Sequence, residues 1–149
     1  MQRPRGVGAA AVLLVGVMLA PVSLVLGEGE DGSGAPVSSG VFTAEQAEAG
    51  REAFAEHCAR CHGAELEGGF GPTLVPLDRD QFGDRPLSHP FGIITTEMPF
   101  DAPGSLEADV YAEILAFILS ENGYPSGPEP LPADRERLTE FVLDDPPAE

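Results

Sequence analysis

The sequence predicts an all-α domain in which capped amphipathic helices are joined by long irregular loops. Apolar residues recur at helical spacing near residues 43–58 and again near 105–121. Between them the chain is rich in Gly and Pro and has no clear strand. The 149 residues suffice for one domain with appendages. So long a loop in a small domain is expected only where it wraps around another group.

The N-terminal residues 1–27 predict an export signal. Arg3 and Arg5 precede a stretch without charge, 7–26, whose length is close to that of a membrane-spanning segment. Two outcomes fit this pattern: cleavage after Gly27, or retention as a membrane anchor. In both, the basic start places the following domain outside the cytoplasm. We therefore expect a periplasmic protein, soluble or tethered to the outer face of the cytoplasmic membrane.

A flexible linker is predicted over residues 28–40, which contain little apolar material. The domain itself is predicted to span residues 41–125. Its first helix begins at Thr43, which forms a capping-box pattern with Gln46. One face of this helix then carries Ala47, Gly50, Phe54 and Cys58. We expect Gly50 to permit a close helix contact.

Two further helices are predicted in the second half of the domain. A short one runs from about Leu87 to Thr96. Ser105 is predicted to cap the longest helix, which Asn122 and Gly123 end. Its apolar face consists of Leu106, Val110, Ile114, Phe117 and Ile118. Residues 126–149 are expected to form a Pro- and acid-rich C-terminal extension, with a short amphipathic helix over 133–143.

Both cysteines lie in one motif, Cys58-Ala59-Arg60-Cys61-His62. C-x-x-C-H is typical of covalent attachment of a c-type haem. Each thiol can add to one vinyl group of the porphyrin, and the histidine can then act as the proximal iron ligand. A redox dithiol would need a thioredoxin-like β-α-β setting, and zinc would need four ligands. The motif thus predicts one covalent haem on Cys58 and Cys61, with iron on His62.

Met98 is the candidate for the second axial ligand. It is the only methionine after the leader, and Pro99 follows it in a predicted loop. A thioether ligand favours reduced iron and raises the potential, which suits electron transfer. The alternatives are His57 and His89, and Met98 could instead only fill the core.

Loop residues complete the candidate site. A proximal histidine needs an acceptor for its other ring nitrogen, and a backbone carbonyl near Pro72 and Leu74 can supply it. Arg79 and Arg85 are candidates for pairing with the haem propionates. The alternative for both arginines is an ordinary solvated position.

The charge balance is strongly acidic. Eight basic residues, all arginine, stand against 25 acidic ones, for a net charge of -17. A surface of this sign repels nucleic acid and favours a partner with positive charge.

These residues resemble the class I c-type cytochromes. The resemblance runs from about Val41 to Pro125 and rests on Gly50-x-x-x-Phe54, the C-x-x-C-H-G motif, Gly71-Pro72-x-Leu74, Met98-Pro99, and residues 116–119 before Asn122-Gly123. It implies crossing N- and C-terminal helices with loops wrapped around one covalent haem. It also implies that His62 and Met98 are axial ligands and that the Pro72 carbonyl orients His62. The lysine-free surface departs from the family's usual docking edge.

The segments 98–106 and 122–134 are similar to cytochrome domains that accept electrons from periplasmic dehydrogenases. We therefore expect a carrier of single electrons, not an enzyme, between a dehydrogenase or quinol-oxidising complex and a downstream oxidase or cytochrome. One alternative is a haem-based sensor or small-ligand binder with a labile sixth position. Another is a fixed subunit of a dehydrogenase complex, docked through residues 126–149.

Overall fold

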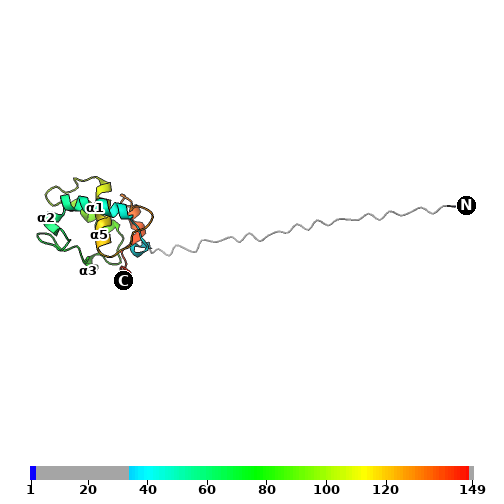
Figure 1. Ribbon diagram of the computed structural model, residues 1–149, viewed down its shortest axis with the longest axis horizontal. Helices are drawn as coiled ribbons and strands as arrows, with labels where there is room; N and C mark the ends of the chain where they lie inside the picture. The colour runs from blue at the N-terminus through cyan, green and yellow to red at the C-terminus, as the bar shows by residue number, and fades with distance from the viewer. Residues whose placement is uncertain (3–33, 148–149) are drawn as a thin grey trace. The chain divides into compact units, whose positions relative to one another are not determined.

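The computed structural model describes residues 1–2 and 34–147. The predicted leader at 7–26 and the first part of the predicted linker lie outside the described residues. Residues 34–147 form a helical domain (Figure 1), which confirms the all-α prediction. Among the residues described, no helix has the length and apolar character needed to cross a membrane. The helices are α1 (Ala44–His57), α2 (Ala59–His62), α3 (Arg79–Phe82), α4 (Ser88–Glu97) and α5 (Ala108–Glu121).

Helices α1 and α5 pack closely against each other at Gly50. A Cβ on Gly50 would overlap the carbonyl of Glu113 and crowd Cβ of Phe117, so only glycine allows this approach. One turn further along α1, the rings of Phe54 and Phe117 are 5.3 Å apart, centroid to centroid. The close contact predicted for Gly50 is confirmed.

The start of α1 is confirmed, whereas the start of α5 differs from the prediction. Thr43 Oγ1 accepts a hydrogen bond from the backbone N–H of Gln46, as an N-cap should. Helix α5 begins at Ala108 with Glu107 in the N-cap position, not at Ser105. Ser105 instead belongs to a turn, in which its N–H donates to the carbonyl of Ala102.

The segments at the two ends of the domain pack together. Strand β1 (Ala35–Pro36) pairs in parallel with β2 (Phe141–Val142). Val37, in the short 3-10 helix Val37–Ser39, is fully buried. The flexible linker predicted over 28–40 is therefore wrong for residues 34–40, which contribute to the core.

The C-terminal segment is also part of the core. Its buried side chains are Leu131, Leu138 and Leu143. The predicted helix over 133–143 is wrong, since only a 3-10 turn, Arg137–Glu140, and β2 form there. Gln46 holds the segment by two hydrogen bonds to the backbone of Leu131, at 2.9 and 2.7 Å, rather than closing a capping box.

Candidate haem-binding site

Helices α1 and α2 place the C-x-x-C-H motif on a single turn of backbone. Cys58 is both the C-cap of α1 and the N-cap of α2, so no loop separates the two helices. Both thiols are free and half-buried. Burial, together with the neighbouring Cys61, raises the pKa of the Cys58 thiol to about 11. Reactive dithiols have lowered thiol pKa values, so this environment disfavours redox dithiol chemistry.

His62 is held by the loop that follows the motif. The side chain is buried, and its Nδ1 lies 2.9 Å from the carbonyl oxygen of Pro72. A carbonyl can only accept, so Nδ1 carries the ring proton and Nε2 keeps a lone pair for a metal. A Cβ on Gly71 would lie 2.7 Å from Cε1 of the ring, so the backbone there fits closely over the histidine.

Asn122 fixes the loop that carries Pro72. Its Oδ1 accepts from the N–H of Leu77 at 2.7 Å, and its Nδ2 donates to the carbonyls of Leu74 and Ile118 at 2.8 and 2.7 Å. The sequence predicted Asn122 only as a helix end. Its amide connects the end of α5 to the segment that orients His62.

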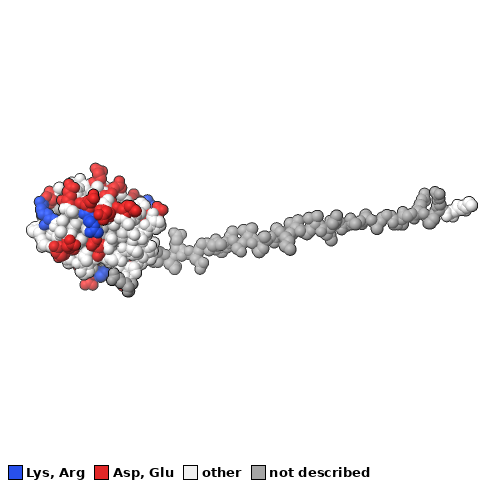
Figure 2. Space-filling view, viewed as in Figure 1, with Lys and Arg blue, Asp and Glu red and all other residues white. Residues whose placement is uncertain are grey.

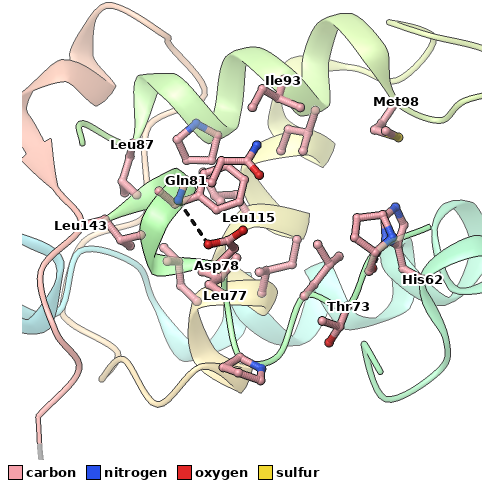
Figure 3. Close-up of a pocket in the computed structure, with 18 residues that line it drawn as sticks. His62, Thr73, Leu77, Asp78, Gln81, Leu87, Ile93, Met98, Leu115 and Leu143 are labelled. Carbon is pink, nitrogen blue, oxygen red and sulfur yellow. Dashed lines mark hydrogen bonds between the residues drawn. The ribbon is translucent and has the colours of Figure 1, made fainter. Parts of the chain in front are cut away.

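Two neighbouring cavities share His62, Pro72 and Met98 as lining residues. The first has a volume of about 260 Å³. Its walls are largely aliphatic, with Leu74, Leu77, Ile93, Ile94, Leu115 and Ile118 among them (Figure 3). The second, of about 240 Å³, includes Cys58 and Cys61 in its lining. An apolar space with two thiols at one side and a histidine and a methionine on its walls has the donor set that haem c requires.

Met98 ends α4 and begins the loop that leads to α5. Its side chain lines both cavities, and in Figure 3 it lies at the same end of the first cavity as His62. The Met98 carbonyl accepts a hydrogen bond from the hydroxyl of Tyr111 at 2.7 Å and from the N–H of Gly104 at 3.1 Å. Tyr111, on α5, is 3% exposed. No local motif predicts this role for Tyr111; a tyrosine on an apolar helix was the available signal.

The two histidines considered as alternative ligands differ in their position relative to the cavities. His57 lines the second cavity next to the cysteines, and its Nε2 is 3.9 Å from the Glu56 carboxylate. His89 packs against the ring of Phe82, at 6.0 Å between centroids, and lines neither cavity. The structure thus brings together Cys58, Cys61, His62, Pro72 and Met98.

The two arginines considered for the propionates lie away from this group. Arg79 Nη1 donates to the carbonyl of Asp144 at 2.8 Å, and Nη2 is paired with Asp145 at 3.0 Å. Arg85 is exposed, and neither arginine lines the two cavities. Arg79 instead holds the C-terminal segment against the domain.

The part of the chain that the structure describes holds no cluster of three or more His, Cys, Asp and Glu side chains suited to a metal ion. Structural zinc needs four such ligands.

Comparison with known proteins gives the family. Residues 45–118 match the family model described as cytochrome c oxidase, cbb3-type, subunit III. Among solved structures, the sulfane dehydrogenase SoxCD from Paracoccus pantotrophus is similar, with 23% sequence identity and a TM-score of 0.45 over 72% of this chain and 63% of that chain. No curated protein sequence matches. The family match, together with the helical fold and the C-x-x-C-H motif, shows that the chain belongs to the class I c-type cytochromes, electron-transfer proteins that bind haem c covalently.

Proposed function

We propose that this cytochrome is a periplasmic carrier in which Cys58 and Cys61 bind the haem and His62 and Met98 are the axial ligands. The observation that carries this proposal is that these four side chains and Pro72 surround the same pair of cavities. When bound, haem supplies a one-electron couple at its iron. The protein's part is to hold the ligands and to exclude water.

Contacts within the protein orient the His62 side chain. The Pro72 carbonyl keeps the proton of His62 on Nδ1, so Nε2 is directed to the cavity with its lone pair. The Met98 thioether, which lines the same two cavities, would favour the reduced state of a bound iron. The aliphatic lining between them keeps the local dielectric low. If His62 and Met98 both bind the iron, no position would remain open for a substrate, which is why we propose a carrier and not an enzyme.

We also propose that the leader exports the protein and that residues 7–26 are either removed or kept as an anchor. The donor is then a periplasmic dehydrogenase or a quinol-oxidising complex, and the acceptor is an oxidase or another cytochrome. A fixed subunit of an oxidoreductase complex is a second candidate, because the description of the matching family model names an oxidase subunit. The intact mass of the purified protein reveals whether the first 27 residues are present.

Carbon monoxide binding to the ferrous holoprotein tests the proposal. We expect no prompt binding in the native protein and prompt binding, with a lowered midpoint potential, in Met98→Ala. His57→Ala and His89→Ala serve as matched controls and should behave as the native protein does. Prompt binding by the native protein would favour the sensor with a labile sixth position. An unchanged spectrum in Met98→Ala, with a changed one in His89→Ala, would assign the ligand to His89.

A further inference from the structure

The C-terminal strand β2 leads directly into the wall of the first cavity. The residue after β2, Leu143, lines this cavity together with Leu87, and their side chains are 1% and 0% exposed. In Figure 3 both lie at the end of the cavity away from His62 and Met98. The match to the family model ends at residue 118, so Leu143 belongs to a segment outside that match.

Backbone pairing holds this segment on both of its edges. On one edge β2 pairs in parallel with β1. On the other, the N–H of Leu143 donates to the carbonyl of Arg85, and the Leu143 carbonyl accepts from the N–H of Asp84, both at 2.9 Å. The Phe141 carbonyl accepts from the N–H of Leu87, also at 2.9 Å. The backbone of the strand is therefore engaged within the domain, which argues against a C-terminal segment that is free to dock on another subunit.

Side chains from other parts of the domain hold the residue that follows Leu143. Arg79 Nη1 donates to the carbonyl of Asp144 at 2.8 Å, and the hydroxyl of Tyr124 donates to the same oxygen. The N–H of Ser38 donates to Oδ1 of Asp144 at 3.0 Å. The position of Leu143 against the cavity is therefore fixed by contacts that lie outside the cavity.

The wall that Leu143 supplies bears on the potential of a bound haem because it excludes water. Ferric haem carries one more positive charge than ferrous haem, and a charge is less stable where water is excluded. Apolar walls therefore favour the ferrous state and raise the midpoint potential, as the hydrophobic shell of a metal site generally does. The acidic side chains visible across the domain in Figure 2 act in the opposite direction, because negative charges favour the ferric state.

We propose that the C-terminal segment is the closing wall of the haem site and that Leu143 raises the midpoint potential by excluding water from it. This inference rests on the proposed carrier function. The alternative is that Leu143 adds only to the stability of the core. Leu138 provides the comparison, because it is fully buried in the same segment but lines neither cavity.

Equilibrium redox titration of the holoproteins Leu143→Ala and Leu138→Ala tests the proposal. Each substitution removes the same atoms from a buried leucine, so thermal stability should fall in both. Both are neutral replacements, so the surface charge is unchanged. In Leu143→Ala alone, the equilibrium constant for one-electron reduction should fall by about tenfold, the lower end of effects around metal sites, which is about 59 mV. Leu143→Met nearly conserves the side-chain volume and should retain the native potential.

Carbon monoxide binding to each ferrous variant shows whether the potential falls for the proposed reason. It should remain slow in Leu143→Ala, because this end of the cavity lies away from Met98. Prompt binding would mean that the potential falls through loss of the Met98 ligand, which would overturn the role in water exclusion. If Leu143→Ala does not accumulate as holoprotein, Leu143→Val should shift the potential in the same direction by less.

The outcomes separate this inference from the carrier function on which it rests. A native potential in Leu143→Ala, or an equal fall in Leu143→Ala and Leu138→Ala, would overturn the role of the segment in the haem site and leave the carrier function standing. Prompt binding of carbon monoxide by the native ferrous holoprotein would instead overturn the carrier function.

Discussion

At the scale of single residues, two buried tyrosines on the same domain make equivalent hydrogen bonds with different consequences. Tyr111 and Tyr124 are 3% and 4% exposed, and each hydroxyl donates to a backbone carbonyl. The acceptor is Met98 for Tyr111 and Asp144 for Tyr124. Only the first of these bonds therefore restrains the loop that carries the proposed sixth ligand.

We predict that Tyr111→Phe makes the sixth position accessible. The ring remains, but the hydrogen bond to the Met98 carbonyl is lost, at a cost of about 1–2 kcal/mol. A change of 1.4 kcal/mol is tenfold in an equilibrium, so the displaced state of the Met98 loop should gain about tenfold in population. Carbon monoxide binding to the ferrous holoprotein should be faster by about this factor, with a lower midpoint potential.

Tyr124→Phe is the matched control for this prediction. It removes the same kind of bond from a buried tyrosine, so thermal stability should fall in both variants. Carbon monoxide binding should remain native only in Tyr124→Phe. Equal binding rates in the two variants would show that the Tyr111 hydroxyl contributes stability alone and does not position Met98.

Local motifs made the residues of the site predictable, whereas contacts between distant residues did not. C-x-x-C-H places two thiols and an imidazole within five residues, so the sequence alone predicts its chemistry. The bond from Tyr111 to Met98 depends instead on the path of the loop between α4 and α5. A tyrosine on an apolar face requires a partner for its hydroxyl, but the sequence does not say which carbonyl.

At the scale of elements, the close approach of α1 to α5 at Gly50 predicts that a Gly→Ala substitution there destabilises the protein, although the same substitution usually stabilises a helix. Gly→Ala in an unconstrained helix interior stabilises by about 1 kcal/mol. At Gly50 the added Cβ would meet the carbonyl of Glu113 and the side chain of Phe117. We expect Gly50→Ala to destabilise the protein by about 1–3 kcal/mol, the usual cost of overpacking. The midpoint of urea unfolding of the holoprotein measures it.

Gly92 in α4 provides the control, since it too is a buried helical glycine. The nearest atoms that a Cβ there would meet belong to the guanidinium of Arg135, the far end of a flexible side chain. Gly92→Ala should therefore leave the free energy of unfolding within about 0.5 kcal/mol of the native value, or raise it. A stabilised Gly50→Ala would contradict the close approach of α1 and α5.

The start of a helix was predictable where the capping residue has no other role. It was not predictable where a tertiary contact uses the same residue. Thr43 has one local role and caps α1 as expected. Ser105 is also a favoured capping residue type, but its N–H takes part in the turn that ends the Met98 loop. The N–H of Leu106 then lies 3.4 Å from the hydroxyl of Tyr111, outside the helix. The later start of α5 follows from this loop and not from propensity.

At the scale of the whole domain, its two ends stabilise each other. Residues 34–40 and 141–144 are joined by the β1–β2 pairing and by bonds from Ser38 to Asp144. Neither segment has apolar residues at regular spacing over a long stretch. Each contributes only isolated side chains, such as Val37 and Leu143, to the core. Apolar periodicity is a property of one stretch of chain, so the sequence predicts a linker and an extension where the structure has two paired segments.

This pairing makes stability depend on pH through Asp144. Burial opposes the shift, but hydrogen bonds from the Ser38 side chain and N–H hold the pKa of Asp144 below its usual value. An Asp carboxyl titrates near 3.9 when unfolded. The resulting stability is therefore complete above about pH 4 and is lost as pH falls through the lower, folded-state value. The folded domain should weaken in acid for this reason among others.

Ser38→Ala isolates the contribution of this pair. It removes the hydroxyl donor, so the free energy of unfolding should drop at pH 7. The difference from the native protein should shrink in acid, once pH lies below the folded-state pKa and the carboxyl is protonated in both states. Ser39→Ala is the matched control, because the Ser39 hydroxyl donates to the carbonyl of Pro36, which does not titrate. Its effect should be the same at pH 7 and in acid. If the two serine variants show the same pH dependence, the bond to Asp144 is not what couples the ends of the domain to protonation.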